Sequence, residues 1–389
     1  MAGRIGIVSA FALPHLGGIE QFTDNLAREL VSRGHPVSVI TCDFAGLGEY
    51  EMLPSGVEVF RLPCVTLAGD RFPLVRKDAR FRRMDALLAS EEYEGILVNT
   101  RFFSTTPYAL DLGGRAGVRP FVLDHGSAYI GFGSPAIDWA VRLYEHGMTW
   151  RAKRREPDFY GVSQKSVEWL RHFGIEACGA INNAVDAAGF VAQASGRAFR
   201  EELGLGPDAM VVAFTGRLLS SKGVWHVIDV ARALHERGAN VWFAVAGDGP
   251  ELERLQAAAP PNVAFVGRLE KPDVAALLLQ SDLFLFPSEY PEGMPSSVLE
   301  AAACGLSTIG TDVGGMREIL PSDEYGVVYE RFDAEDCVRR IEGMLEGREA
   351  LKEAGERCRQ RVEREFSWKR TADAVLAACE RAKRGADVS

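Results

Sequence analysis

Short hydrophobic runs rich in β-branched residues alternate with amphipathic stretches along the whole chain. Continuous apolar runs of this length are typical of strands in a parallel sheet, because helices cover both of its faces. The alternation therefore predicts an α/β fold built on parallel sheets. The predicted strands are RIGIVSAF (4–11), PVSVIT (36–41), VEVFRLP (57–63), GILVNT (95–100), PFVLDHG (120–126) and FYGVS (159–163), followed by MVVAFTGR (210–217), NVWFAVAGDG (240–249), NVAFVGR (262–268), DLFLFPS (282–288), LSTIGTD (306–312) and YGVVYE (325–330).

The same rhythm starts again in the second half of the chain, so two doubly wound sheets in tandem are expected. A chain of 389 residues is also too long for one ordinary hydrophobic core. The segment INNAVDAAGF (181–190) is the expected join, which places the two domains at 1–183 and 184–365. A helical segment, 366–389, completes the chain.

The first eighteen residues, MAGRIGIVSAFALPHLGG, have some features of a weak signal peptide. We interpret them as a first buried strand, because a glycine turn and a helical pattern follow directly. That helical pattern covers 19–35, and Gly34 is the expected C-terminal stop. No apolar run approaches the 18 residues that a membrane-spanning helix needs.

Composition and cysteine usage narrow the class of protein. The chain is 47% hydrophobic and 25% charged, as is typical of a soluble globular protein. Its seven cysteines are scattered singly, without a CxxC pair or a Cys/His ligand spacing. Reduced thiols in the cytoplasm are therefore expected, and neither a disulfide framework nor a zinc site is.

The charge is unevenly distributed. The first 185 residues carry 20 Lys and Arg against 21 Asp and Glu, so most of the net charge of −10 lies in the second half. This balance disfavours nucleic acid as a partner. Two stretches, 71–84 and 150–155, are nevertheless rich in basic and aromatic residues. We hypothesise that they contact anionic membrane lipid or capture an acidic or lipid-linked acceptor, the alternative being a solvated face.

Ligands of open parallel sheets bind beyond the carboxyl ends of the strands. The loops at those ends are unusually rich in glycine and charge, and together they predict a two-sided cleft. They are PHLGGIEQ (14–21), DHGSAY (124–129), GRLLSSKG (216–223), GDGPE (247–251), SEYPEGMPSS (288–297) and TDVGGMRE (311–318).

Two glutamates separated by seven residues stand out in the fifth of these loops. The pattern predicts a helix from Ser296 to about Gly305, so the loop presents backbone N–H groups at a helix N-terminus, where anions bind. Glu300 lies one turn into this helix, among small residues that leave room for a ligand. Its carboxylate can accept two hydroxyl hydrogen bonds, as from a ribose diol. Glu292 would face the group beyond the phosphates. The alternative for each is a solvated surface glutamate.

Cations follow the strand 210–217. Arg217 and Lys222 lie five residues apart across a serine-containing turn. Two fixed cations there can hold a diphosphate and stabilise the negative charge that it gains on leaving. If the motif stood alone, a loop with solvated basic side chains would be the simpler interpretation.

Glycines and one histidine complete the set of candidates. Gly17 and Gly18 precede a helix, where they allow a phosphate or sugar to approach the backbone closely. Gly247 belongs to a weaker signal, since glycines in strand-to-helix turns often serve backbone geometry alone. His125 ends a predicted strand, where a neutral imidazole can hydrogen-bond a sugar hydroxyl or act as an acid or base near pH 7.

Taken together, these segments resemble the retaining GT-B glycosyltransferases of family 4. The resemblance covers nearly the whole chain and is strongest where the R-x4-K and E-x7-E motifs occur in their usual loops. The segments that carry it are GGIEQFTDNLARELVSRGHPVSVIT, GVSQKSVEWL, INNAVDAAGF, GRLLSSKG, VAGDGPELERL, VAFVGRL, FPSEYPEGMPSSVLEAAACGLSTIGTDVGG and the terminal FSW helix.

The resemblance implies a GT-B fold, with two Rossmann-like domains facing a cleft and a C-terminal helix from about Phe366 that crosses back to the first domain. It assigns the acceptor to the first domain and the nucleotide-sugar donor to the second. One departure concerns EGMPSS, where many relatives have EGFGLP. Because of it, the resemblance does not predict the form of the donor-sugar pocket. The implied catalytic residues are His125, Arg217, Lys222 and Glu292, and the implied donor-binding residues are Gly17, Gly18, Gly247, Arg268, Gly293, Met294, Ser296, Ser297 and Glu300.

The implied activity is transfer of a hexose-type sugar, with retention of configuration, from a UDP or GDP sugar to an acceptor hydroxyl. The leaving diphosphate would take the acceptor's proton during attack on the same face of the sugar. No DxD motif occurs in the strand-to-helix loops, so a metal-independent site without a cofactor is expected. A sugar or lipid-linked acceptor in cell-envelope glycan or glycolipid synthesis would place the enzyme in the cytoplasm, at the inner face of the membrane.

Two other functions stay open at this point. A sugar-nucleotide 2-epimerase shares the two-domain fold but would turn over its donor without an acceptor. A non-catalytic nucleotide-sugar binding module is the second alternative. A plain Rossmann dehydrogenase is disfavoured, because neither half has a complete GxGxxG with a downstream acidic residue.

Overall fold

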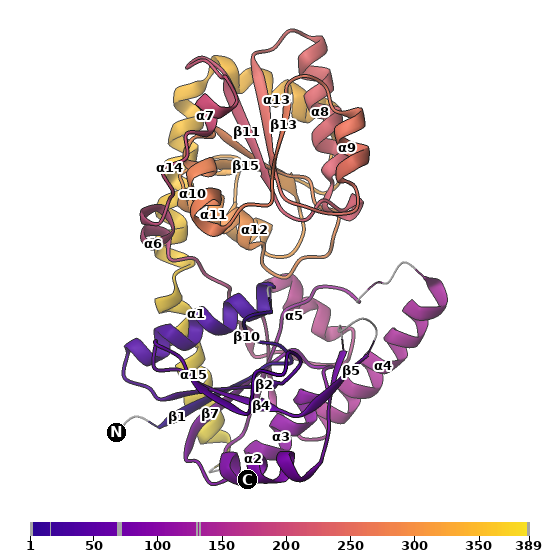
Figure 1. The fold of residues 1–389 in the computed structure, drawn as a ribbon, viewed down its shortest axis with the longest axis vertical. Helices are drawn as coiled ribbons and strands as arrows, with labels where there is room; N and C mark the ends of the chain where they lie inside the picture. The colour runs from indigo at the N-terminus through magenta and orange to yellow at the C-terminus, as the bar shows by residue number, and fades with distance from the viewer. Residues whose placement is uncertain (1–2, 16, 68–71, 130, 132–133, 387–389) are drawn as a thin grey trace. The chain divides into compact units, whose positions relative to one another are not determined.

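The computed structural model describes all residues except 1–2, 16, 68–71, 130, 132–133 and 387–389. It divides into two compact units, each with its own sheet (Figure 1). Unit 1 comprises 1–183 together with 368–389, and unit 2 comprises 184–367.

The sheet of unit 1 has eight strands in the order β10-β9-β8-β7-β1-β2-β4-β3, and β5 and β6 form a separate antiparallel pair. All neighbours in the large sheet are parallel except β3, which runs antiparallel to β4 at one edge. The strands are β1 (Arg4–Val8), β2 (Val37–Cys42), β3 (Tyr50–Met52), β4 (Glu58–Leu62), β5 (Cys64–Leu67), β6 (Phe72–Val75), β7 (Tyr93–Asn99), β8 (Phe121–Asp124), β9 (Asp158–Gly161) and β10 (Gly179–Ala180).

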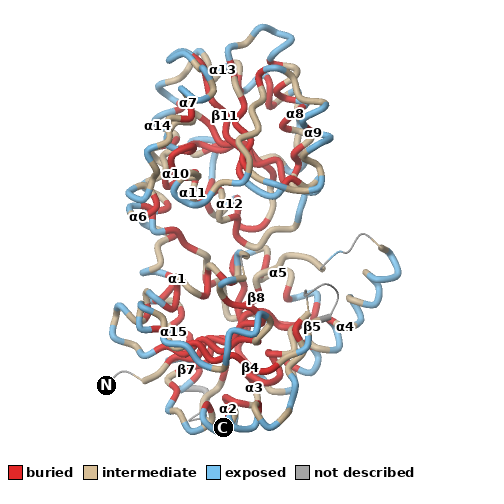
Figure 2. Tube along the Cα trace, in the orientation of Figure 1, coloured by how far each residue is buried: buried red, intermediate tan, exposed pale blue. Residues whose placement is uncertain are grey.

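Helices pack against this sheet, and its central strands are buried (Figure 2). The C-terminal helix α15 packs against α1 and β7. Two contacts fix it there: the rings of Phe22 and Trp368 lie 5.7 Å apart, and Arg33 donates to Asp373 at 2.6 Å. The helices are α1 (Gly18–Ser32), α2 (Ala79–Ala89), α3 (Thr105–Arg115), α4 (Pro135–Lys153), α5 (Gln164–Arg171) and α15 (Trp368–Ala386).

The sheet of unit 2 has six parallel strands in the order β13-β12-β11-β14-β15-β16. This is the doubly wound order, in which the chain reverses its direction of progress between the first and fourth strands. The point of reversal therefore lies between β11 and β14. The strands are β11 (Met210–Thr215), β12 (Val241–Ala246), β13 (Val263–Gly267), β14 (Leu283–Phe286), β15 (Ser307–Thr311) and β16 (Gly326–Tyr329).

The main core of unit 2 lies between this sheet and one helical layer, which includes α8 and α13. On another side, α11 packs against α14 and α6. The helices are α6 (Ala187–Ala192), α7 (Phe199–Glu202), α8 (Val224–Glu236), α9 (Leu252–Ala258), α10 (Lys271–Leu279), α11 (Ser296–Ala303), α12 (Met316–Ile319), α13 (Ala334–Glu346) and α14 (Arg348–Glu365), with a short 3-10 turn, η1 (Ser220–Lys222).

All twelve strands predicted from hydrophobic runs are confirmed, as are the start of α11 at Ser296 and the end of α1 before Gly34, which has a φ of +85°. The sequence did not predict β3, β5, β6 or β10. These strands have two to four residues, and none of them is central to either parallel sheet: β3 and β10 lie at the edges of the large sheet, and β5 and β6 form a separate pair. No helix in the described part of the chain is both long and apolar enough to cross a bilayer.

Candidate active site

The loops that follow β11 and β14 meet at the point of reversal in the sheet of unit 2. The amide of Glu289 donates to the carbonyl of Ser221 at 2.9 Å and so joins the two loops. Gly223 ends the first loop with a φ of +71°. A Cβ at this position would lie 1.8 Å from the carbonyl oxygen of Pro287, so only glycine allows the loops to pack this closely.

Lys222 and Glu292, which are 70 residues apart in sequence, form an ion pair here. The hydroxyl of Ser288 donates to the same carboxylate oxygen at 3.3 Å, and the Lys222 ammonium lies 4.6 Å from the ring centre of Tyr290. Both charged side chains are less than one-fifth exposed. The structure thus brings together two residues that the sequence predicted separately. An arriving anion would compete with Glu292 for the lysine.

Arg217 follows β11 and projects into solvent. Its side chain makes no hydrogen bond or ion pair with any residue that the structure describes. It is therefore a cation that needs no rearrangement before it meets an anionic ligand.

The N-terminus of α11 lies at the same edge of the sheet. Pro295 occupies the N-cap and supplies no side-chain cap. The amides of Ser296 and Ser297 therefore lack intrahelical acceptors and carry the positive end of the helix dipole. The loop after β15 supports the segment before α11, because the amide of Gly315 donates to the carbonyl of Gly293 at 2.9 Å. The neighbouring Met294 is buried.

Glu300 lies one turn into α11, and its side chain makes no hydrogen bond or ion pair with the described residues. Desolvation raises the pKa of its carboxyl group to about 7, against a smaller opposing effect from Lys271. Its neighbours in the helix, Ala301 to Ala303, are fully buried. A partly buried carboxylate without a protein partner is a polar group that a ligand can satisfy.

Gly247 and Arg268 follow the other two strands on this side of the sheet. Gly247 has a φ of +148°, and a Cβ there would lie 1.8 Å from the carbonyl oxygen of Gly216. Close packing between loops is therefore sufficient to require glycine. Arg268 is exposed after the edge strand β13, with β12 between it and β11. Contact of either residue with the donor stays a prediction.

In unit 1, His125 directly follows β8 and belongs to a chain of hydrogen bonds. Its Nε2 lies 2.8 Å from the Oδ1 of Asn99, whose Nδ2 donates to Thr23 at 2.8 Å, and the Thr23 hydroxyl donates to the carbonyl of Ile19. Because the Asn99 oxygen can only accept, Nε2 carries the proton and Nδ1 has the lone pair. Desolvation lowers the pKa of His125 to about 3. The imidazole is thus a neutral acceptor, which favours the predicted hydrogen bond to a sugar hydroxyl over acid catalysis near pH 7.

Two family models match the chain. Residues 16–188 match the model described as Glycosyltransferase Family 4, and residues 196–361 match the model described as Glycosyl transferases group 1. The chain belongs to the family 4 GT-B glycosyltransferases.

Known proteins that this glycosyltransferase resembles match it over almost its full length. It is 22% identical to an uncharacterized glycosyltransferase of Methanocaldococcus jannaschii, over 95% of this chain and 96% of the relative. It is 27% identical to a phosphatidylinositol N-acetylglucosaminyltransferase polypeptide of Arabidopsis thaliana, over 94% and 79%. Among solved structures, Anabaena HepE in complex with UDP superposes with a TM-score of 0.74 at 17% identity, over 98% of this chain and all of that one.

The predicted glycines of this glycosyltransferase lie at the N-terminus of α1. Gly17 is the N-cap, and α1 begins at Gly18 without a side-chain cap. A Cβ at Gly18 would meet no described atom within 4 Å, so packing does not require glycine there. The open backbone fits the predicted close approach of a ligand, which remains a prediction.

A buried charge cluster lies beneath the tip of β8 and was not predicted from the sequence. Arg101 is 1% exposed and donates to Glu145 at 2.9 Å, while Asp124 lies 3.5 Å away. Its guanidinium also stacks 3.9 Å from the ring centre of Phe173. Desolvation raises the pKa of Asp124. Since these residues are far apart in sequence, no local motif marks the cluster, and only the fold brings it together.

Proposed function

We propose that this glycosyltransferase transfers a hexose, with retention of configuration, from a UDP or GDP sugar to an acceptor hydroxyl. The observation that carries the proposal is the cluster at the point of reversal in unit 2. It combines Lys222, Glu292, an uncapped helix N-terminus and Glu300, whose carboxylate has no partner in the part of the chain that the structure describes. Doubly wound sheets bind nucleotides at this position.

Each part of the donor has a matching group in this cluster. The ribose diol would donate to Glu300, whose carboxylate lacks a donor among the described residues. The exposed Arg217 would bind the diphosphate, together with Lys222 and the free amides at the start of α11. Once the diphosphate draws Lys222 away, Glu292 can accept hydrogen bonds from the sugar hydroxyls. The UDP bound in the HepE structure is in keeping with a nucleotide partner.

Catalysis then rests on stabilising the leaving group. Negative charge grows on the diphosphate as the glycosidic bond breaks, and fixed cations and amides bind that charge more tightly than the ground state. The acceptor hydroxyl attacks from the face that the diphosphate leaves, and a phosphate oxygen takes its proton. Glu292 is held by Lys222 and serves as a ligand for hydroxyls in this scheme. With two protein cations in place, we propose that the reaction needs no metal.

A screen of donors tests this function. Purified protein is incubated with UDP, GDP and ADP sugars, and release of the nucleoside diphosphate is measured with and without added glycosides. We expect one donor to be cleaved faster with an acceptor and to yield a product of unchanged anomeric configuration by NMR. Inversion would overturn the retaining mechanism, donor isomerisation without an acceptor would indicate the epimerase, and binding without turnover would indicate the non-catalytic module.

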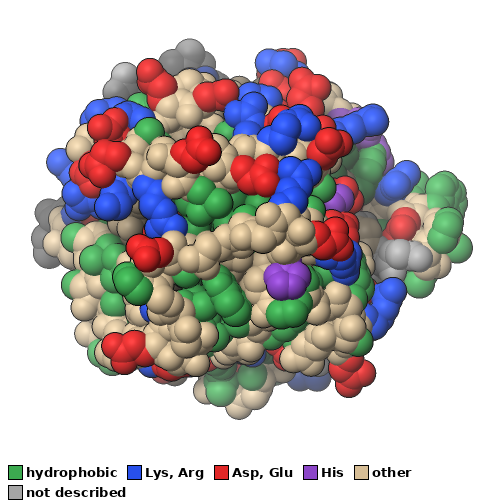
Figure 3. All heavy atoms as spheres, turned by 90° about the horizontal axis from the view of Figure 1, so that it is seen from above, with side chains coloured by type: hydrophobic (Ala, Val, Ile, Leu, Met, Phe, Trp, Pro, Cys, Tyr) green, Lys and Arg blue, Asp and Glu red, His purple; other side chains and the backbone are tan. Residues whose placement is uncertain are grey.

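We also propose that α4 docks on anionic membrane, where a lipid-linked acceptor would be found. Trp139, Leu143 and Trp150 are 61–68% exposed, and at 100° per residue they fall within about 40° of one another around the helix. Arg142 and Arg154 flank this stripe. Figure 3 shows hydrophobic and basic side chains together on the segment that projects at the right, which is α4 in Figure 1. Exposed apolar stripes with basic borders are typical of interfacial helices.

The two predicted basic stretches differ in how far other residues of the protein engage their basic side chains. In 71–84, Arg76, Arg80 and Arg83 are engaged by nearby carboxylates. In 150–155, Arg155 pairs with an aspartate and Lys153 caps backbone carbonyls, while Arg154 lies over a tryptophan ring at the surface. The second stretch, continued along α4, is therefore the stronger candidate.

Changing both exposed tryptophans, Trp139→Ser with Trp150→Ser, should lower binding to vesicles with 30% anionic lipid by about tenfold or more, since each removes a large apolar surface from the contact. Vesicle flotation measures this binding. Leu87→Ser on α2, where the leucine is 50% exposed, is the matched control and should bind like the wild type. Equal flotation of all three proteins, or no preference for anionic lipid, would contradict the proposal.

A further inference from the structure

Polar side chains from three elements of unit 1 form a chain of hydrogen bonds that ends at His125. Thr23 lies on α1, Asn99 is the last residue of β7, and His125 directly follows β8. Thr23 and Asn99 are each 1% exposed. Because buried donors and acceptors in proteins are almost always paired, only a few arrangements of the hydrogens in this chain are possible.

Thr23 determines which way the side-chain amide of Asn99 points. The Thr23 hydroxyl oxygen lies 2.8 Å from the carbonyl oxygen of Ile19 and 2.8 Å from the amide nitrogen of Asn99. The hydroxyl has a single hydrogen, which it donates to Ile19, so toward Asn99 it can only accept. With the amide reversed, the hydroxyl would have to donate to Asn99, and its bond to Ile19 would be lost. The amide oxygen of Asn99 therefore faces His125.

Asn99 in turn determines which nitrogen of His125 carries the proton. Its oxygen lies 2.8 Å from Nε2 and can only accept, so Nε2 is protonated. The ring of Phe22, with its centre 5.0 Å away, restrains the imidazole by an edge contact. The other nitrogen, Nδ1, has a lone pair, makes no hydrogen bond with any described residue and is not among the buried atoms. It is the acceptor in this chain that a ligand can reach.

The charges around His125 limit what Nδ1 can bind. The charged groups beneath the tip of β8 are Arg101, Asp124 and Glu145, and they pair with one another rather than with the imidazole. Desolvation lowers the pKa of His125 to about 3, so the ring is neutral. A neutral acceptor binds a group that donates a hydrogen, such as a hydroxyl. An ionised phosphate or carboxylate oxygen has no hydrogen to donate to Nδ1.

Resting on the proposed function, we propose that Thr23 and Asn99 are positioning residues that hold His125 as the Nε2–H tautomer, so that Nδ1 accepts a hydrogen bond from a hydroxyl of the sugar substrate. Neither of them touches the substrate: Thr23 acts on the amide of Asn99, and Asn99 acts on the imidazole. A purely structural role would not depend on which nitrogen of His125 carries the proton. The tautomer of His125 therefore distinguishes the two roles.

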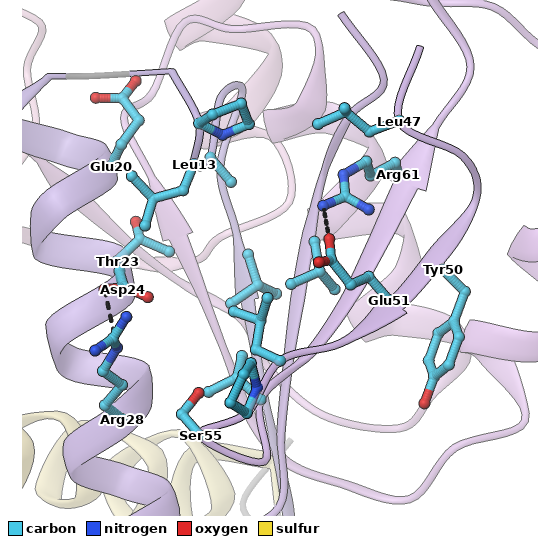
Figure 4. A pocket seen from close by; sticks show the side chains of 17 residues that line it. Leu13, Glu20, Thr23, Asp24, Arg28, Leu47, Tyr50, Glu51, Ser55 and Arg61 are labelled. Carbon is cyan, nitrogen blue, oxygen red and sulfur yellow. Dashed lines mark hydrogen bonds and ion pairs between the residues drawn. The ribbon is translucent and has the colours of Figure 1, made fainter. Parts of the chain in front are cut away.

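Nitrogen NMR of the full-length protein with labelled histidine measures this tautomer without any sugar. We expect Nε2–H in the wild type. Thr23→Val removes the hydroxyl at nearly constant volume and allows the amide of Asn99 to reverse, so a fraction of His125 should carry its proton on Nδ1. Thr23→Ser keeps the hydroxyl and is the matched control, with the wild-type tautomer. Thr23 lies at the wall of a cavity of about 720 Å³, which Arg61 also lines (Figure 4), so neither change forces a clash.

A second pair of variants tests the contact between Asn99 and His125. Asn99→Asp places a carboxylate against Nε2, and an opposite charge in contact should raise the pKa of His125 by about 1–3. Asn25→Asp adds the same charge two positions beyond Thr23, on another face of α1, and should leave that pKa as in the wild type. The same NMR experiment, repeated over a range of pH, measures both. If His125 titrates alike in the two variants, Asn99 does not act on the imidazole.

Activity then tests the contact with the substrate. Thr23→Val should lower kcat/KM for donor cleavage about tenfold, through loss of a correctly directed hydrogen bond, and Thr23→Ser should restore it. Because the tautomer is measured without substrate, the positioning roles and the proposed function fail separately. Nδ1–H in the wild type, or the same tautomer in Thr23→Val as in Thr23→Ser, would overturn the positioning roles. Equal kcat/KM in these three proteins would overturn the hydroxyl contact at Nδ1.

Discussion

Replacing Lys222 with alanine is expected to lower kcat for donor cleavage about 10²–10³-fold, the size of effect seen when one preorganised partner of a developing oxyanion is removed. Two changes contribute. The leaving diphosphate loses a cation, and the carboxylate of Glu292, now without its ion pair, repels the same diphosphate. Release of the nucleoside diphosphate under saturating donor measures kcat directly.

Companion variants separate catalysis from structure. Lys222→Arg keeps the charge and should retain most activity, whereas Lys352→Ala, at an exposed lysine of α14, should behave as the wild type. The double variant Lys222→Met with Glu292→Gln has lost both charges. Its melting temperature should therefore lie closer to that of the wild type than the melting temperature of Lys222→Ala does. A Lys222→Ala enzyme within threefold of wild-type kcat would show that the cation does not act on the leaving group.

Replacing Glu300 with glutamine should raise the donor KM about 100-fold at pH 8, because charge-assisted hydrogen bonds to a ribose diol are lost. The difference should shrink at pH 5.5. With a pKa of about 7, wild-type Glu300 is then protonated and resembles the amide. Donor KM of the wild type should therefore fall as the pH rises through 7, while that of Glu300→Gln stays flat.

The same substitution should stabilise the protein at high pH. In the unfolded chain Glu300 loses its proton near 4.5, but in the folded protein it holds the proton to about 7. The wild type therefore loses stability between these two values, by roughly 3 kcal/mol at most. Glutamine does not titrate, so Glu300→Gln should exceed the wild type in unfolding free energy by up to that amount at pH 8, and by less at pH 5.5.

Denaturant unfolding at the two pH values measures this gain. Glu335→Gln, at a glutamate of α13 whose side chain is 79% exposed, is the matched control and should show no such pH-dependent gain. If Glu300→Gln binds the donor more weakly but is more stable to unfolding, Glu300 is a binding group that lowers the free energy of unfolding. If both variants lost stability equally, Glu300 would be an ordinary structural residue.

The sequence by itself determined the secondary structure of the core and the family. Apolar runs marked every long parallel strand, because burial on both faces leaves a signal in a few consecutive residues. Glycines at turns were equally local signals, and Gly34 and the start of α11 at Ser296 were found where they were predicted. The predicted strand ends, together with the spacing of Arg217 and Lys222 and that of Glu292 and Glu300, pointed to a donor site before the structure was known.

Only the tertiary structure decided how those groups are paired and charged. The ion pair between Lys222 and Glu292 joins residues 70 positions apart, and the raised pKa of Glu300 follows from the burial of α11 against α14 and α6. The proton on Nε2 of His125 depends on Asn99, which lies on a different strand. The cavity beside Arg61 is formed by α1 and by strands that include the edge strand β3, which the pattern did not predict. Local sequence sets the backbone, but pairing, desolvation and cavities depend on distances between segments that only folding brings together.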